Sequence, residues 1–155
     1  MGEKIGFVGL GIMGAPMAKN MIDAGYEVSA YDIVESNLDK VVDQGAFKAC
    51  CPKEVSEKSD ITIIMVQNSP QSEAAVLGKD GALEGASDGD LIIDMSSISP
   101  LVSQKISEQC QSKRVKFLDA PVSGGEPGAI EGTLAIMTGG NASDFERAKP
   151  IFDVL

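Results

Sequence analysis

Hydrophobic positions along the chain alternate between short continuous runs and stretches with helical spacing. The short runs predict buried strands, whereas Met13, Met17 and Met21 recur every four residues and predict the buried face of a helix. Strands are predicted at residues 4–9, 27–32, 47–50, 60–66, 91–95, 115–119 and 133–138. Helices are predicted at residues 13–24, 35–44, 70–77 and 100–113, with a short helix after Pro52 and a last one from Ser143.

The regular alternation of these elements predicts the fold class. Strands that alternate with helices form a parallel sheet covered on both faces, so we expect an α/β domain of the Rossmann type, doubly wound and mostly parallel. Residues 78–90 are rich in glycine and are predicted to be a loop. Ser143 and Glu146 have the spacing of a capping box. The sequence ends within the last predicted helix, so four apolar side chains are expected to be exposed and to promote self-association: Ile151, Phe152, Val154 and Leu155.

Composition and charge narrow the class of function. The net charge of −10 argues against nucleic acid and against an anionic membrane surface as partners. No apolar run approaches the ~20 residues of a membrane-spanning helix. Three cysteines without a C-x-x-C pair are typical of reduced thiols, so we expect a cytoplasmic protein. The chain contains no histidine, and we predict no metal site and no catalytic residue within it.

The spacing of Gly9, Gly11 and Gly14 is that of the G-x-G-x-x-G loop that binds dinucleotides. Such a loop follows a strand, opens a helix and is joined ~20 residues later by an acidic residue that ends the second strand. Asp32 fills that last position. The pattern assigns the tight turn to Gly9, the approach of a pyrophosphate to Gly11, close helix–strand packing to Gly14 and the ribose hydroxyls to Asp32. The alternatives are a plain turn and an S-adenosylmethionine site, whose usual G-x-G-x-G spacing is missing.

Small polar residues follow the other predicted strands. The segments are Q-N-S-P at 67–70, S-S-I-S-P at 96–100 and A-P-V-S-G-G at 120–125. Ligands of open α/β sheets bind beyond the carboxyl ends of the strands, and these hydroxyls, amides and backbone N–H groups fit an uncharged ring and a small oxygenated substrate. Ser69 and Ser99 have an alternative role as helix caps. No helical pattern is predicted after 120–125.

Two long segments resemble a known family. F-V-G-L-G-I-M-G-A-P-M-A-K-N is similar to the N-terminal signature of the β-hydroxyacid dehydrogenases, and L-D-A-P-V-S-G-G-E-P-G-A-I-E-G-T-L-A-I-M-T-G-G resembles their second signature. The resemblance covers essentially the whole chain. Within the family, N-S-P, D-M-S-S-I-S-P and S-G-G-E-P-G-A-I are most similar to the branch that acts on tartronate semialdehyde.

The resemblance implies a role for specific residues. The cofactor pyrophosphate would lie on six consecutive residues: Gly9, Leu10, Gly11, Ile12, Met13 and Gly14. The remainder of the cofactor would be contacted by Asp32, Met65, Val66, Asn68 and Ser97. The substrate's carboxylate and hydroxyl would be held by Ser123, Gly124 and Gly125. Gln67 departs from the proline of many relatives. Because Ile33 and Val34 add no cation after Asp32, NAD is the expected cofactor, with NADP possible.

The resemblance also implies the organisation of the whole enzyme. Residues 1–155 would form its NAD(P)-binding domain, and an all-helical domain carrying a proton-donating lysine would follow. That enzyme, expected to be a homo-oligomer, would transfer a hydride between NAD(P)(H) and a small 3-hydroxy acid or its carbonyl form, such as tartronate semialdehyde or 3-hydroxyisobutyrate. The alternatives are a dinucleotide-sensing module without catalysis and an imine or phosphogluconate-type reductase.

Overall fold

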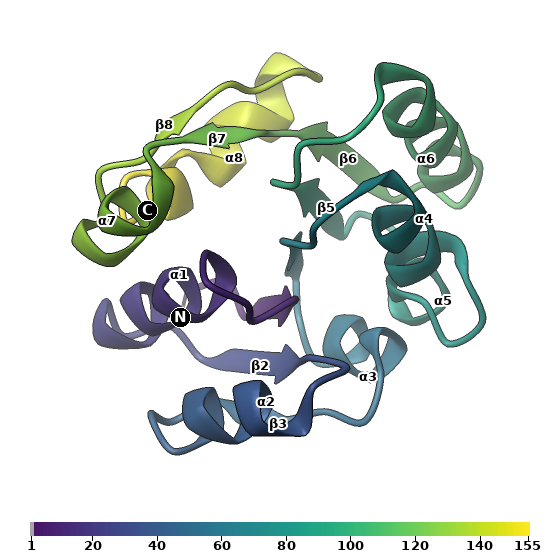
Figure 1. Ribbon diagram of the computed structural model, residues 1–155. Helices are drawn as coiled ribbons and strands as arrows, with labels where there is room; N and C mark the ends of the chain where they lie inside the picture. Colours follow the sequence, from purple (N-terminus) through teal and green to yellow (C-terminus); the bar gives the residue numbers. More distant parts are fainter. Residues whose placement is uncertain (1) are drawn as a thin grey trace.

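A six-stranded parallel sheet forms the centre of the domain (Figure 1). The computed structural model describes residues 2–155. The strand order is β3-β2-β1-β4-β5-β6, which is the order of a Rossmann fold. The strands are β1 (Ile5–Val8), β2 (Val28–Tyr31), β3 (Phe47–Lys48), β4 (Ile61–Ile64), β5 (Leu91–Asp94) and β6 (Lys116–Asp119). The predicted fold class is confirmed.

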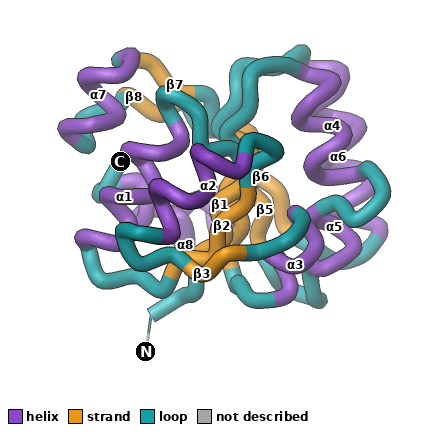
Figure 2. The backbone as a smooth tube through the Cα atoms, turned by 60° about the horizontal axis from the view of Figure 1, so that its bottom comes forward, coloured by secondary structure: helices purple, strands orange, loops and turns teal. Residues whose placement is uncertain are grey.

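Helices cover both faces of this sheet. They are α1 (Gly14–Asp23), α2 (Glu35–Val42), α3 (Pro52–Glu57), α4 (Ser69–Leu77), α5 (Ala82–Gly85), α6 (Pro100–Ser112), α7 (Gly125–Glu131) and α8 (Ala142–Phe152). Figure 2 shows the strands between α1 and α7 on one side and α4, α5 and α6 on the other. Among residues 2–155, no helix combines the length and the hydrophobicity that a membrane crossing requires.

The strands bury two apolar cores because successive side chains of a strand point to opposite faces. Phe7 lies in one core with Met17 and Met21 of α1, while Val8 lies in the other, with residues of α3 to α6. The row of methionines in α1 is therefore core, as the helical spacing predicts. A parallel sheet buried on both faces explains why the strand segments are almost continuously apolar.

Two short helices were not predicted. α5 lies within residues 78–90, which the glycines had marked as a loop. α7 begins at Gly125, the last residue of the 120–125 segment, after which no helical pattern was predicted. Pro127 falls in the first turn, where its missing N–H costs nothing, and Gly132 ends α7 with φ of 68° in the left-handed conformation. The predicted strand 133–138 shrinks to β8 (Ala135–Ile136), which pairs antiparallel with β7 (Val122–Ser123), outside the main sheet.

The end of the chain differs from the sequence expectation. α8 ends at Phe152, and both Ile151 and Leu155 are almost fully buried, so the predicted exposure of these side chains is wrong. The chain turns after α8 and the Leu155 carbonyl accepts a hydrogen bond from the Leu134 amide, at 3.1 Å. Phe152 and Val154 are partly buried against the same core. The predicted capping box is also absent from the described residues: α8 starts one residue earlier, after Asn141.

Candidate functional site

The glycine loop, residues 9–14, connects β1 to α1 and is shaped by two very close backbone approaches. Gly9 has φ of +96°, and a Cβ added to it would lie 2.0 Å from the Met65 carbonyl oxygen. A Cβ on Gly14 would lie 1.9 Å from the Gly9 carbonyl oxygen. No residue with a side chain fits at either position. A Cβ on Gly11 would meet nothing within 4 Å, so this glycine leaves open the space in front of the loop.

The remaining loop residues divide between core and surface. Leu10 is buried, while 71% of Ile12 is exposed. The loop leads into α1, whose N-cap residue is Met13 and which has no side-chain cap and no acidic residue in its first turn. Among the residues that the structure describes, the amides of Ile12 and Met13 donate to no other protein group. Unpaired N–H groups at a helix N-terminus, with the positive end of the helix dipole, form a site for an anion.

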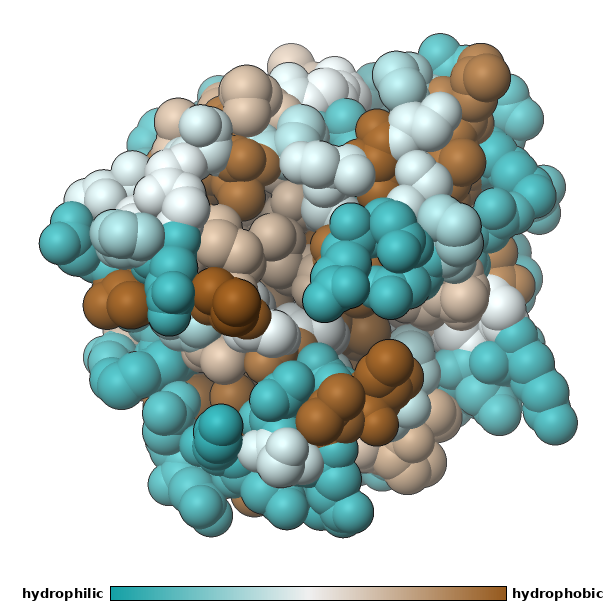
Figure 3. Space-filling model, in the orientation of Figure 1, coloured by the Kyte–Doolittle hydropathy of each residue, from teal (hydrophilic) through white to brown (hydrophobic). Residues whose placement is uncertain are grey.

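Asp32 connects the glycine loop to the end of β2. Its Oδ2 accepts a hydrogen bond from the Leu10 amide at 2.6 Å, and its Oδ1 accepts one from the Val34 amide at 2.7 Å. A carboxylate has about four acceptor positions, so Asp32 retains two for a ligand. The Leu10 amide is already engaged and is unavailable to a phosphate. The apolar side chains of Ile33 and Val34 beyond Asp32 are exposed. Figure 3 shows apolar surface as separate patches among hydrophilic residues and residues of intermediate hydropathy.

A cation that the sequence analysis did not consider lies on the neighbouring strand. The Lys48 amine donates to Asp39 Oδ1 at 2.8 Å and to Glu35 Oε1 at 3.0 Å. These hydrogen bonds, first to Asp39 and then to Glu35, raise the pKa of Lys48. Its charge is thus matched by two carboxylates of α2. Lys48 lies near the end of β2 because the parallel register of β2 and β3 pairs it with Ala30, and this pairing could not be predicted from the sequence pattern.

The ends of β4 and β5 are joined by a hydroxyl group. The Val66 amide donates to Ser96 Oγ at 2.9 Å, and the Ser96 amide donates to Asp94 Oδ1 at 3.0 Å. Met65 and Val66 are partly exposed, whereas Ser97 is exposed. Ser97 was predicted to contact the cofactor and Ser96 was not, although both belong to the same polar segment after the strand. Their opposite exposure follows from their adjacent positions on the extended chain.

Asn68, Ser69 and Ser99 lie where α4 and α6 begin. Asn68 Oδ1 accepts from the Gln71 amide at 3.0 Å and caps α4, and Ser99 Oγ accepts from the Leu101 amide at 3.3 Å and caps α6. Ser69 instead accepts from the Ser99 amide at 2.9 Å and joins the two segments. The capping role considered for Ser99 is therefore confirmed, while α4 is capped by Asn68. The Asn68 amide group still has its two N–H donors for a ligand.

The 120–125 segment follows β6 and is hydrogen-bonded to the end of β5, where the strands carry two aspartates. Its Ala120 amide donates to the Asp94 carbonyl at 2.8 Å. Asp94 is paired in register with Asp119, and burial is the main cause that raises the pKa of each carboxyl. Asp94 Oδ2 is buried and has no hydrogen-bond partner among the described residues. This pair of carboxylates was not predicted, although the strand ends D-M-S-S and L-D-A-P contain both of them.

The substrate residues predicted from the resemblance lie at the end of this segment. Ser123 is exposed in β7, and Gly124 and Gly125 have φ of +141° and +61°. Both glycines are exposed and start α7. The structure therefore presents one hydroxyl and the first amides of α7 on the surface, which are groups that bind a carboxylate.

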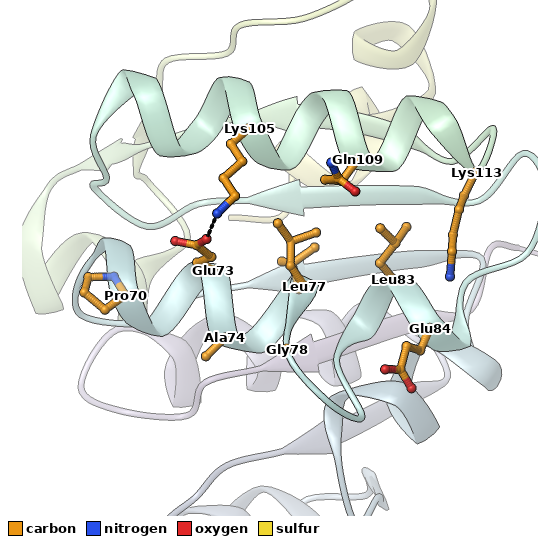
Figure 4. A pocket seen from close by; sticks show the side chains of 11 residues that line it. Pro70, Glu73, Ala74, Leu77, Gly78, Leu83, Glu84, Lys105, Gln109 and Lys113 are labelled. Carbon is orange, nitrogen blue, oxygen red and sulfur yellow. Dashed lines mark hydrogen bonds and ion pairs between the residues drawn. The ribbon is translucent and has the colours of Figure 1, made fainter.

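Two hollows on the surface of the described residues lie elsewhere. One, of about 710 Å³, lies between α4, α5 and α6, where Glu73 and Lys105 form an ion pair across it (Figure 4). The second, of about 510 Å³, lies near Phe117 and Asn141. Neither is lined by a residue predicted to bind cofactor or substrate. The predicted residues instead share the open edge of the sheet at the carboxyl ends of the strands, where nucleotides bind to Rossmann folds.

Comparison with known proteins assigns the family. The sequence profile described as the NAD binding domain of 6-phosphogluconate dehydrogenase matches residues 4–155. The chain belongs to this family of NAD-binding domains. The resemblance to the β-hydroxyacid dehydrogenases is confirmed by the individual relatives.

Three relatives illustrate the relationship. The 2-hydroxy-3-oxopropionate reductase of Escherichia coli (strain K12) is 45% identical over 152 residues, which is 98% of this chain and 52% of that protein. The NAD-dependent L-serine dehydrogenase of Pseudomonas aeruginosa is 39% identical, over 99% of this chain and 51% of its own length. The structure of Mycobacterium tuberculosis 3-hydroxyisobutyrate dehydrogenase with L-serine has a TM-score of 0.90 at 32% identity, over 99% and 52% of the two chains. The chain thus spans about half the length of these relatives.

Proposed function

We propose that this chain is the cofactor-binding part of an NAD-dependent oxidoreductase that acts on a small 3-hydroxy acid or its carbonyl form. The main supporting observation is the hydrogen bond from the Leu10 amide to Asp32. It joins the glycine loop and the ribose-binding carboxylate into one unit before any ligand arrives. A preformed site loses little free energy in ordering its groups when the ligand binds.

The residues at the carboxyl edge have distinct roles in this proposal. The amides of Ile12 and Met13 hold the pyrophosphate above Gly11, and the free lone pairs of Asp32 accept hydrogen bonds from the ribose hydroxyls. Met65, Val66, Asn68 and Ser97 line the path toward the nicotinamide. When bound, the nicotinamide supplies or accepts the hydride. The protein's part is to place its ring against the substrate, because hydride transfer depends on position and orientation.

We propose NAD rather than NADP as the preferred cofactor. A 2′-phosphate would be placed next to the carboxylate of Asp32, which is a like-charge contact. The one cation on the neighbouring strand end, Lys48, is held by Asp39 and Glu35. A phosphate would have to compete with two carboxylates for it.

For the substrate, we propose Ser123, Gly124 and Gly125 as the binding residues for a carboxylate and a hydroxyl. The names of the relatives support a small hydroxy acid or aldehyde acid, and tartronate semialdehyde and 3-hydroxyisobutyrate are our two candidates. Proton transfer at the substrate oxygen is assigned to a group outside residues 1–155. A positioned acid or base contributes about 10²–10⁴-fold to the rate, so the 155-residue chain alone should show almost no turnover.

Calorimetric titration of the 155-residue chain with NADH and with NADPH tests the cofactor assignment. We expect weak but saturable binding of NADH and weaker binding of NADPH. Equal or tighter binding of NADPH would refute the preference, and no binding of either nucleotide would refute the site. Steady-state NADH oxidation with tartronate semialdehyde tests the proposed substrate and the proposed location of the proton donor. A longer protein that contains this domain serves as the comparison. Activity of the 155-residue chain within about tenfold of that protein would show that the proton donor lies among these residues.

A further inference from the structure

Two adjacent thiols lie at the rim of the proposed ribose site. Cys50 and Cys51 form the connection between β3 and α3, and their Sγ atoms are 3.7 Å apart. Cys50 is exposed and Cys51 is partly exposed, whereas Cys110 is buried in the core. The proposed binding of a dinucleotide assigns no role to either of the adjacent thiols.

The register of the sheet places this pair beside Asp32. β2 and β3 run parallel with Ala30 opposite Lys48, and the Ala49 amide donates to the Ala30 carbonyl at 3.0 Å. The paired register ends at Lys48; continued along both chains it would bring Cys50 level with Asp32, and paired strands lie ~4.8 Å apart. Tyr31 lies among the same groups: burial, then Cys51 and Asp32, raise the pKa of its hydroxyl. A group attached to the thiols would therefore stand at the ribose site.

The spacing of the two sulfur atoms distinguishes between two kinds of dithiol chemistry. A disulfide usually joins Cα atoms 4.4–6.8 Å apart, but adjacent residues hold them at ~3.8 Å, so a direct S–S bond here would be strained. An atom that forms two bonds of ~2.3 Å to sulfur would instead bridge the observed 3.7 Å at an angle of about 107°. That angle is nearly tetrahedral and needs no change in the separation of the sulfur atoms.

The number of available ligands indicates what kind of atom can bind. Among residues 2–155, no group of three or more histidine, cysteine, aspartate or glutamate side chains is arranged to hold a metal ion. Structural zinc takes four protein ligands, so the pair is incomplete for zinc. The two thiols do supply enough ligands for an atom that already carries one substituent and can form two further bonds, both to sulfur.

We propose that Cys50 and Cys51 form a dithiol site that captures a thiophilic centre of this type, namely a monosubstituted trivalent arsenical, and that the captured group and the dinucleotide exclude each other. In the capture step each sulfur loses its proton and forms one As–S bond. The As=O bond of the reagent breaks, and its oxygen leaves as water with the two protons. Arsenic remains trivalent, so the step needs no oxidant. The mutual exclusion rests on the proposed function, whereas the capture does not.

Treatment of the 155-residue chain with phenylarsine oxide tests the capture. We expect one phenylarsenic group per chain by intact mass, reversed by a small dithiol, and no stable adduct with Cys50→Ser or Cys51→Ser. Alkylation of the remaining thiol and an unchanged circular dichroism spectrum show that each variant is folded. Cys110→Ser is the matched control and should retain capture. Stable adducts on the single-thiol variants would overturn the proposal. So would a wild type that takes up no arsenic and whose mass falls by two hydrogen atoms because air oxidises the thiol pair to a disulfide.

A second measurement tests the exclusion. With NADH at ten times its Kd, arsenical labelling should slow about elevenfold, because only the free protein reacts. Labelled protein should in turn lose NADH binding. If labelled and unlabelled chains bind NADH equally, the exclusion is wrong. If the untreated chain binds no NADH at all, the proposed function fails instead, and the mass measurement alone decides whether the dithiol site exists.

Discussion

Two glycine-rich segments at the carboxyl edge of the sheet use glycine for different physical reasons. In the glycine loop, Gly9 and Gly14 are required because a Cβ would lie within 2.0 Å of backbone oxygen atoms. In the 120–125 segment, a Cβ on Gly125 would touch only Pro127 at 3.7 Å, and the requirement comes from its φ of +61°. Gly14 is thus required by space and Gly125 by conformation, so equal substitutions at these two positions should have unequal consequences.

The two segments also lie on different supports. Leu10 of the glycine loop is buried in the apolar core. The 120–125 segment is anchored on Asp94, which is fully buried and adjoins Asp119. The loop that is assigned to the cofactor is thus packed into the apolar core and joined to Asp32 through the Leu10 amide, whereas the segment assigned to the substrate rests on buried carboxyl groups. The pH dependence that comes from these buried carboxyl groups should therefore belong to the second region.

The largest expected effect is that of Gly14→Ala in the glycine loop. Its Cβ would overlap the Gly9 carbonyl, which cannot move without shifting β1 and α1, and we expect a loss of about 3 kcal/mol or more of the free energy of unfolding. Gly11→Ala is the matched control, because its Cβ meets open space. It should change stability by no more than about 0.5 kcal/mol and yet weaken NADH binding.

Urea denaturation and NADH titration of both variants separate the two roles. A stable, folded Gly14→Ala would show that the loop is less tightly packed than the structure indicates. If Gly11→Ala binds NADH as tightly as the wild type, the pyrophosphate does not bind in the space in front of Gly11.

The next effect concerns the connection between loop and ribose site. Asp32→Ala removes the proposed hydrogen bonds to the ribose and should weaken NADH binding by about 10- to 100-fold, since hydrogen bonds to charged groups contribute roughly 1.5–3 kcal/mol. The substitution also leaves the Leu10 amide without its hydrogen-bond partner, which should weaken the binding of both nucleotides. The affinity for NADPH should nevertheless fall less than the affinity for NADH. Asp23→Ala, which breaks an exposed ion pair with Lys19, is the control. An unchanged ratio of the two affinities would show that Asp32 does not select the cofactor.

A smaller effect is expected in the 120–125 segment. Gly125→Ala places a side chain in the left-handed region, at a cost of roughly 1–2 kcal/mol, without a steric overlap. Asn adopts this conformation more readily than Ala, so Gly125→Asn should be the less destabilised of the two. Neither should alter NADH binding. Thermal unfolding compares the pair, and equal destabilisation by Ala and Asn would mean that space, not conformation, limits this position as well.

Sequence patterns predicted the sheet because its strands are local signals. The run D-I-T-I-I-M-V contains β4, and the position of Asp32 after the second strand follows from the glycine spacing. The link from Leu10 to Asp32 was not predicted, because it depends on how β1 and β2 pair. Ser96 and Ser97 could not be distinguished either, because only the bond from Val66 shows which of them faces inward.

The C-terminal third was predicted less well because distant contacts form it. α7 has the composition of a loop, yet its Ala129 carbonyl accepts a hydrogen bond from Asn20 Nδ2 of α1 at 2.9 Å. Leu155 is buried through a hydrogen bond to Leu134 and through the core below it. Such contacts override local preferences, and no pattern within a short window contains them.

The smallest effect tests whether the support of the 120–125 segment titrates. Burial is the main cause that raises the pKa of Asp94, and hydrogen bonds from Ser96 oppose it. A carboxyl whose pKa is higher in the folded than in the unfolded protein stabilises the fold below the unfolded pKa, and this stability is lost as the pH rises through the folded pKa. Asp94→Asn keeps an oxygen for the Ser96 amide and does not titrate. It should therefore be more stable than the wild type at pH 8, by about 1 kcal/mol, and this advantage should shrink toward pH 4.

Urea unfolding of both proteins across this pH range measures the difference. Asp119 is present in both proteins, and its charge is, after burial, one of the causes that raise the pKa of Asp94, so the measured difference includes the interaction between the two carboxyl groups. Gly11→Ala, in the apolar region, provides the contrast, and its difference from the wild type should be the same at every pH. A constant difference for Asp94→Asn would mean that Asp94 keeps the same charge in the folded and unfolded protein, and the two supports would then be electrostatically equivalent. A difference that grows toward pH 8 would identify the Asp94 carboxyl as the titrating group beneath the proposed substrate segment.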